Sequence, residues 1–166
     1  MIFETERLLI RKLKITDIDA FHEMQNNINV MRYTDSPIKN LEENIADLNR
    51  VIAFYNKPKN DFWVFAVIRK SDNSFLGTIA LIKDEEENNE IGYRFLEKYW
   101  NKGYAYESIV GLLKYAKKTG KTELVAMVIV DNIASEYILK KTGFTFVKEY
   151  ICESLNLLER LYKIKL

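Results

Sequence analysis

The length of the chain, 166 residues, fits one domain, because a single hydrophobic core serves chains of up to roughly 200 residues. Hydrophobic residues make up 48% of the chain and aromatic residues 13%, which excludes a disordered protein. The 25 basic and 24 acidic residues leave a net charge of +1, so the composition supports neither a nucleic acid nor a membrane as a partner. We therefore expect one globular, soluble domain spanning residues 1–166.

The N-terminus and the cysteine content favour a cytoplasmic protein. Acidic residues stand near the N-terminus, where a secretory signal needs positive charge, and no stretch approaches membrane-spanning length. Cys152 is the only cysteine, which excludes an intramolecular disulfide and any zinc site built on cysteine pairs. No metal site is expected.

The first elements predicted are one strand and two helices. Residues 7–13 are rich in Leu and Ile and predict a strand. Thr16, followed by Asp19 three residues later, predicts the N-cap of a helix whose apolar spacing continues to Ile28. Asn40 is predicted to cap a second helix. The apolar stripe of that helix consists of Leu41, Ile45, Leu48, Ile52 and Tyr55.

The middle of the chain predicts antiparallel strands. Residues 62–68 are apolar on both faces and residues 75–82 nearly so, while residues 71–74 between them have turn chemistry. Residues 90–96 predict one further short strand. We expect the first two strands to form a hairpin, the third to lie in the same sheet, and both faces of the hairpin to be buried.

The second half of the chain predicts a parallel crossover. Apolar residues from Ala105 to Ala116 follow helical spacing, and residues 124–130 are an uninterrupted apolar strand. Strand, helix and buried strand in this order predict a parallel pair. A short helix over residues 134–142 is expected to end at Gly143. The last two strands are expected at residues 146–151 and 158–165. The fold class is α/β, with a mixed sheet and helices on both faces.

Residues 100–105 lie between the fourth predicted strand and the amphipathic helix. Backbone N–H groups and the helix dipole can hold an anion there, and Gly103 lets the backbone approach a phosphate closely. Small Ala105 avoids a clash at the same surface. Taken alone, the same pattern also fits a glycine that serves only a turn.

A second block, residues 132–135 and 141–144, follows after one helix and one strand. With it, the sequence resembles the GNAT superfamily, in the branch that contains the acetyltransferases of ribosomal-protein N-termini and their small-molecule relatives. The resemblance covers nearly the whole chain. It is carried by Thr5, Glu6, Arg7, Leu8, Arg11, Asp17, Gly77, Thr78, Ile79 and the segments 90–93, 99–105 and 132–144.

The resemblance implies a strongly twisted sheet, splayed between the fourth and fifth strands, with acetyl-CoA entering at the splay. Backbone groups of Tyr93, Arg94 and Phe95 would pair with the pantetheine arm, and Asn132 would bind the same arm. The pyrophosphate would lie on a phosphate cradle formed by Asn101, Lys102, Gly103, Tyr104, Ala105 and Tyr106. Trp100 departs from the Gln or Arg commonest at its position, although Trp is usual in this branch.

Acetyl transfer to an amine needs a base, because free amines are mostly protonated at neutral pH. Glu90, at the start of the cofactor-facing strand, is the first candidate. Glu153, expected on the C-terminal strands, is the second. An exposed carboxylate at a strand edge is the simpler interpretation of Glu90.

The departing thiolate needs a proton or electrostatic support. Many GNAT enzymes place a tyrosine seven residues after the asparagine, but that position is Leu139 here. Ser135 resembles the hydroxyl used in the ribosomal-protein branch and is the candidate acid, while Tyr137 should turn away on the helix. Alternatively, Ser135 packs locally and the helix N-terminus alone steadies the thiolate.

The function implied is direct acetyl transfer from acetyl-CoA to an amine. The acceptor is either a protein N-terminus or a small molecule such as an aminoglycoside or polyamine, and the sequence does not separate them. A non-catalytic acyl-CoA-binding or sensor domain is the alternative, because the usual tyrosine is missing. Members of this superfamily often form dimers, and the sequence leaves a homodimer open.

Overall fold

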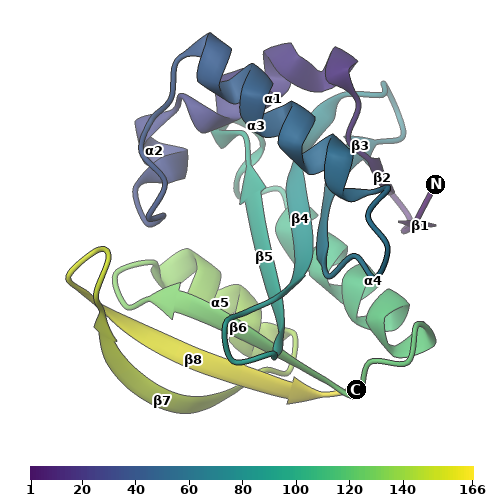
Figure 1. Ribbon diagram of the computed structural model, residues 1–166. Coiled ribbons are helices and arrows are strands. Elements are labelled where there is room, and N and C mark those ends of the chain that lie inside the picture. Colours follow the sequence, from purple (N-terminus) through teal and green to yellow (C-terminus); the bar gives the residue numbers. More distant parts are fainter.

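The protein is an eight-stranded mixed sheet with helices on both faces, described here over residues 1–166 by a computed structural model (Figure 1). The strands are β1 (Phe3–Glu4), β2 (Leu8–Lys12), β3 (Phe62–Arg69), β4 (Phe75–Lys83), β5 (Asn89–Phe95), β6 (Glu123–Ile129), β7 (Thr145–Cys152) and β8 (Leu157–Lys165). The helices are α1 (Ile18–Gln25), α2 (Ile28–Met31), α3 (Leu41–Phe54), α4 (Tyr104–Lys118) and α5 (Ile133–Lys141), with 3-10 turns at Ile15–Asp17 and Glu97–Tyr99. None of these helices is long and apolar enough to cross a membrane.

The sheet is splayed at its centre. Its strand order is β1-β2-β3-β4-β5-β6-β8-β7, and every neighbouring pair is antiparallel except β5 and β6. The parallel pair aligns at a single position, Glu90 opposite Val125, and the two strands then diverge (Figure 1). The predicted splay is confirmed, and so is the α/β class. The splay lies between the fifth and sixth strands, and not between the fourth and fifth as expected, only because the short strand β1 precedes the first predicted strand.

Two apolar cores lie on the two faces of the sheet, and β3 serves both. Phe65 and Val67 belong to the core beneath α4 and α5, whereas Ala66 and Ile68 belong to the core beneath α1 and α3. Successive side chains of a strand point to opposite faces, so a strand covered on both sides must be apolar throughout. This explains the uninterrupted apolar run of that segment.

The predicted N-cap at Thr16 is wrong. A 3-10 turn over Ile15–Asp17 precedes α1, and the side chain that caps the turn is that of Asp17, which accepts from the Lys14 N–H at 2.8 Å. Arg11 binds both carboxylate oxygens of Asp17 at 2.7 Å. Because Asp17 is held by these two partners, the chain tightens before the α-helix begins.

One continuous helix through Ile28 is also not found. α1 ends at Gln25, and the Asn27 side chain accepts from the N–H groups of Asn29 and Val30, which starts the separate helix α2. Asn competes with the backbone for hydrogen bonds and favours caps over helix interiors. The turn brings residues 29–36 to the cleft described next, which all of them except Met31 line.

Candidate active site

A cleft of about 2150 Å³ follows the splay between β5 and β6. Its walls come from β4, β5, the start of α4, the end of β6, α5, the β7–β8 hairpin and the segment from α1 to α3. The candidate residues that line it are Glu90, Tyr93, Arg94, Phe95, Asn101, Gly103, Tyr104, Ala105, Tyr106, Asn132 and Ser135. Lys102 and Glu153 do not line it. The structure therefore brings most of the sequence-predicted site together.

The phosphate cradle is a tight turn into α4. Asn101 and Gly103 both have positive φ, 58° and 77°, and α4 begins directly afterwards at Tyr104. The first N–H that finds a partner inside the helix is that of Glu107, which donates to Gly103 O. The N–H groups of residues 104–106 therefore remain free, and together with the positive end of the helix dipole they suit a pyrophosphate.

The turn between β1 and β2 anchors this end of α4. Glu107 Oε1 accepts from Thr5 Oγ1 at 2.5 Å and from the Arg7 N–H at 2.8 Å, while Oε2 accepts from Arg7 Nε at 2.6 Å. Burial would raise the pKa of Glu107, but these hydrogen bonds outweigh it and lower the pKa. Arg7 also donates to Lys102 O at 3.1 Å. Thr5 and Arg7 thus act on the cradle by holding it in place.

Trp100 is fixed beside the same turn. Its Nε1–H donates to Phe95 O at 2.8 Å, so the indole links the end of β5 to the cradle. That carbonyl is consequently occupied. Past Glu90, β5 has no aligned strand partner on its β6 side, and the backbone of Tyr93 and Arg94 lies along this open edge.

Glu90 lies at the one position where β5 and β6 align, and it is largely buried. Burial, and to a smaller extent the neighbouring charges of Asp84, Glu159 and Asp35, raise the pKa of Glu90 to about 7. A carboxyl with a pKa near the working pH is suited to take up a proton and give it back. Its position on the cleft wall replaces the interpretation as an exposed strand-edge carboxylate.

The second candidate base, Glu153, is not on a strand. It lies in the exposed turn between β7, which ends at Cys152, and β8, which begins at Leu157. The hairpin instead presents Tyr150 and Glu159 to the cleft, directly opposite each other. Burial and the adjacent Glu159 raise the pKa of Tyr150, so its phenol stays protonated at neutral pH. No sequence motif marks these two residues, because only the strand pairing brings them to the site.

The start of α5 forms the opposite wall. Asn132 Oδ1 caps the helix by accepting from the Ser135 N–H at 3.3 Å, and the Ser135 hydroxyl has no partner in the protein. Tyr93 donates its hydroxyl to Ser135 O at 3.5 Å, and burial raises the pKa of Tyr93 to about 12. Leu139 is 2% exposed and belongs to the core, whereas Tyr137 is 63% exposed. The Ser135 hydroxyl is therefore free to meet a group in the splay.

Comparison with known proteins decides the class. The family model for an acetyltransferase (GNAT) domain matches residues 7–145. The chain belongs to the GNAT acetyltransferase family. It is therefore an acetyl-CoA-dependent acetyltransferase, and the resemblance read from its motifs is confirmed.

Known N-acetyltransferases match most of the length of the chain. An uncharacterised N-acetyltransferase of Bacillus subtilis, YnaD, is 34% identical over 86% of this chain and 82% of its own. The solved structure of RimL, a ribosomal-protein α-N-acetyltransferase in complex with coenzyme A, is 17% identical, with a TM-score of 0.85 over 99% of this chain and 97% of its own. The spermidine N-acetyltransferase of Vibrio cholerae, in complex with coenzyme A and spermine, is 20% identical, with a TM-score of 0.83 over 97% and 96%. These two structures share the GNAT fold with this chain.

The groups around the GNAT cleft fit acetyl-CoA. The free N–H groups at the start of α4 match its pyrophosphate, and the open edge of β5 matches an arm that contains amides. The structure contains no group of three or more His, Cys, Asp or Glu side chains that could hold a metal ion.

Replacing Gly103 with valine tests the cradle. A β-branched residue at φ 77° is strained, and its side chain would rise where the phosphate must approach, because only Arg7 Nη2 lies within 4 Å of an added Cβ. We expect acetyl-CoA to bind at least about tenfold more weakly by calorimetry, which is a loss of about 1.4 kcal/mol or more.

Gly120 offers a matched control. Its φ is 86°, an added Cβ would meet nothing within 4 Å, and it lies outside the cleft at the far end of α4. Gly120→Val introduces similar backbone strain, about 1–2 kcal/mol, without touching the cradle. Equal loss of acetyl-CoA affinity in both folded variants would mean that strain, and not phosphate approach, explains the result.

Proposed function

We propose that the chain transfers the acetyl group of acetyl-CoA directly to an amine bound in the cleft, with Glu90 as the base and Ser135 beside the departing sulfur. The observation that carries this proposal is the position of Glu90, a largely buried carboxylate with a pKa of about 7 at the point where β5 and β6 part. Pantetheine and acceptor would meet there from opposite sides of the sheet.

Glu90 would act on the acceptor side. On β5, Ile91, Tyr93 and Phe95 face the core beneath α4, so Glu90 faces the side covered by α1 and α3. An ammonium entering from that side loses a proton to Glu90, directly or through a water, and the neutral amine attacks the thioester carbonyl carbon. The C–N bond forms as the C–S bond breaks, the attacking nitrogen loses its second proton to become the amide, and the thiolate of coenzyme A takes up a proton and leaves as the thiol.

Ser135 would act on the cofactor side. Its unpartnered hydroxyl lies in the first turn of α5, where the helix dipole also favours negative charge. A hydrogen bond from this hydroxyl would stabilise the sulfur as negative charge develops on it. Burial keeps the Tyr93 phenol protonated close by, and its hydrogen bond to Ser135 O orients the same turn.

The acceptor is proposed to be a protein N-terminus or a small amine. Two structures with this fold are named for these substrates: RimL for ribosomal-protein N-termini and the Vibrio cholerae enzyme for spermidine. The cleft is open enough for either, since the segment of residues 29–36 and the β7–β8 hairpin border it without closing it.

Release of thiol from acetyl-CoA, followed with a panel of amines, tests the proposal. The panel contains short peptides with free N-termini, polyamines and aminoglycosides, and mass spectrometry identifies the acetylated product. Amine-dependent thiol release is expected from at least one class. Acetyl-CoA binding without turnover on any amine would favour the non-catalytic acyl-CoA sensor instead.

A further inference from the structure

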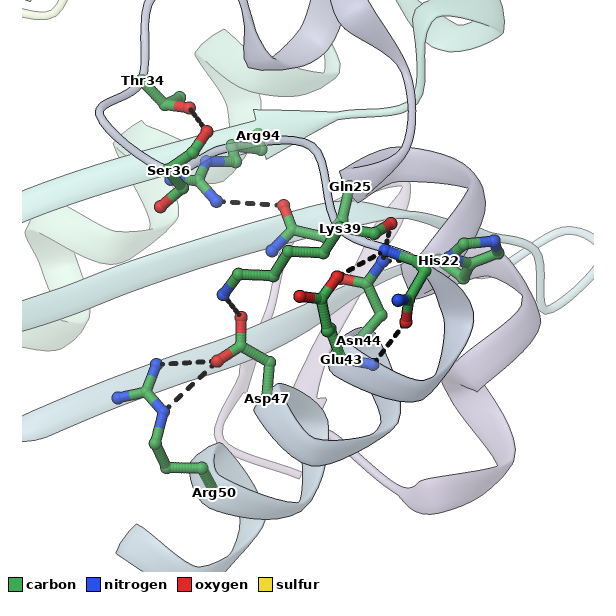
Figure 2. A network of polar contacts seen from close by, with 11 residues as sticks. His22, Gln25, Thr34, Ser36, Lys39, Glu43, Asn44, Asp47, Arg50 and Arg94 are labelled. Atoms are coloured by element: carbon green, nitrogen blue, oxygen red, sulfur yellow. Dashed lines mark hydrogen bonds and ion pairs between the residues drawn. The ribbon is translucent and has the colours of Figure 1, made fainter. Parts of the chain in front are cut away.

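Arg94 is a largely buried cation without a counter-ion. Its side chain projects from β5 onto the acceptor side of the cleft, two residues beyond Gly92. The guanidinium makes one hydrogen bond, from Nη1 to Gln25 Oε1 at 2.9 Å (Figure 2). None of the twelve ion pairs of the protein includes Arg94. Burial lowers the pKa of Arg94, which means that the charged form is poorly stabilised where it lies.

Neither of the nearby carboxylates, Asp47 and Asp35, forms an ion pair with Arg94. Asp47 is bound by Lys39 at 2.5 Å and by Arg50 at 3.2 Å, as Figure 2 shows. Asp35 is exposed and makes no hydrogen bond to the guanidinium. Buried charges in proteins are normally paired, because desolvation without a partner is costly. An arginine held here by a neutral amide alone has nitrogens to spare for an anion from outside.

Two further donors stand beside these nitrogens. Gln25 uses its oxygen on Arg94, so its Nε2 amide group is left without a protein partner and lines the cleft. Thr78 lies directly opposite Arg94 in the β4–β5 register, and its hydroxyl also lacks a partner in the protein and lines the cleft. The guanidinium and the amide N–H groups are donors, and the hydroxyl can also donate, while the nearby Gln25 Oε1 already accepts from Arg94. A set that can donate from three side chains suits a carboxylate or phosphate.

The floor between this donor set and Glu90 is open. Gly92 lies between Glu90 and Arg94 on the same face of β5, opposite Ala80 on β4. A Cβ added to Gly92 would meet nothing nearer than Ala80 Cβ at 4.0 Å, so neighbouring atoms do not fill the space above it. Positions 90 and 94 are about 13 Å apart at roughly 3.3 Å per residue. A short extended chain can lie across this floor.

We propose that Arg94, with Gln25 and Thr78, binds a carboxylate or phosphate group on the acceptor, and thereby selects amines that carry an anionic group at the other end of a short chain. This inference rests on the proposed function and narrows its acceptor class. The amine lies toward Glu90 and the anion lies toward Arg94, so a di- or tripeptide with a free carboxylate, or an aminoalkyl phosphate, has the right chemistry.

Matched acceptor pairs test the inference. Triglycine is compared with its C-terminal amide, and 3-aminopropyl phosphate with 3-aminopropanol, in wild type, Arg94→Gln and Arg94→Lys. In wild type we expect the anionic member of at least one pair to have a kcat/KM at least about tenfold higher, and the pair that shows it identifies the anion. Arg94→Gln should bring that ratio close to one, and Arg94→Lys should keep part of it.

Arg50→Gln is the matched control. It removes the same charge from the rim of the same cleft, where the guanidinium is already paired with Asp47, and it should leave the ratio as in wild type. An equal fall of the ratio in Arg50→Gln would overturn a local site and indicate general electrostatic attraction. No preference for either anion in wild type would overturn the inference outright, as would a ratio untouched by Arg94→Gln.

Binding separates this inference from the proposed function. Calorimetry with N-acetyltriglycine and its amide on the coenzyme A-bound protein needs no turnover, and the acid should bind more tightly in wild type but not in Arg94→Gln. Tighter binding of the acid without thiol release on any amine would reject the proposed function alone. Thiol release on amines with equal binding of acid and amide would reject this inference alone.

Discussion

Replacing Glu90 with glutamine is expected to lower kcat by about a hundred- to ten-thousandfold, the range typical for loss of a positioned base. The amide keeps the shape of the carboxylate but cannot take a proton from the acceptor ammonium. In wild type, activity should rise as pH increases through about 7, because Glu90 must be ionised to act and burial holds its pKa there. This rise, the acidic limb of the pH profile, should be missing in Glu90→Gln. The profile is measured as kcat from pH 5 to 9.

Two neighbouring carboxylates give the controls. Glu159 is one of the charges that raise the pKa of Glu90, so Glu159→Gln should move the limb to lower pH while the rate at high pH is retained. Glu153 lies in an exposed turn outside the cleft, so Glu153→Gln should behave as wild type. A full rate in Glu90→Gln, or the same loss in Glu153→Gln, would remove Glu90 from the role of base.

Loss of folding would not explain the Glu90→Gln result. The folded-state pKa of Glu90 lies above its unfolded value, so the folded protein loses stability as pH rises from about 4.5 to about 7, because the unfolded chain ionises Glu90 in this range while the buried carboxyl still holds its proton. Glutamine carries no charge to desolvate. Glu90→Gln should therefore unfold at least as high in temperature as wild type at pH 8, and a clearly lower unfolding temperature would point to a structural role.

Ser135→Ala is expected to lower turnover by about ten- to a thousandfold, which corresponds to about 1.4–4 kcal/mol of transition-state stabilisation. The hydroxyl is unpartnered and lines the cleft at the start of α5, so its removal takes away a donor to the departing sulfur. Alanine is the better helix former, so the fold should not suffer. The measurement is kcat for thiol release, with acetyl-CoA affinity followed by calorimetry and expected to be nearly unchanged.

Tyr137→Phe is the control for Ser135, because Tyr137 lies two residues further along α5 and is 63% exposed. It should be nearly silent. The opposite ranking, with little turnover in Tyr137→Phe and normal turnover in Ser135→Ala, would show that the donor is Tyr137 and that Ser135 is on the wrong face of α5. Full turnover in both variants would leave the sulfur supported only by the helix dipole and solvent.

The buried strands and the parallel pair could be predicted because their signals are local, whereas the splay was implied by the resemblance to the GNAT superfamily. Residues 62–68 are apolar on both faces, which predicts burial on both sides, and strand, helix and buried strand predict the parallel pair. The helix from Asn132 carries its own cap, and Gly103 marks the start of α4 with a positive φ. In these segments the local preference and the tertiary structure agree.

The rest depends on pairing between distant segments. Tyr150 and Glu159 reach the cleft through the register of the β7–β8 hairpin, which contains an irregularity between Phe146 and Lys148. Glu153 was expected on a strand, but the hairpin turns there, and Asn156 takes a positive φ of 52° within the turn. The sequence predicted only that the backbone of Arg94 pairs with pantetheine. No pattern in the sequence shows that the Arg94 side chain lacks a counter-ion.

Two-substrate kinetics test direct transfer in the cleft most directly. Initial rates are measured while acetyl-CoA and an active amine are varied together. The mass of the protein is measured by mass spectrometry after exposure to acetyl-CoA alone. A direct attack needs both substrates bound at once, so reciprocal plots should intersect, each thiol released should match one acetylated amine, and the chain should gain no acetyl group. Parallel plots together with an acetylated chain, or thiol release without an acetylated amine, would contradict direct acetyl transfer between acetyl-CoA and an amine.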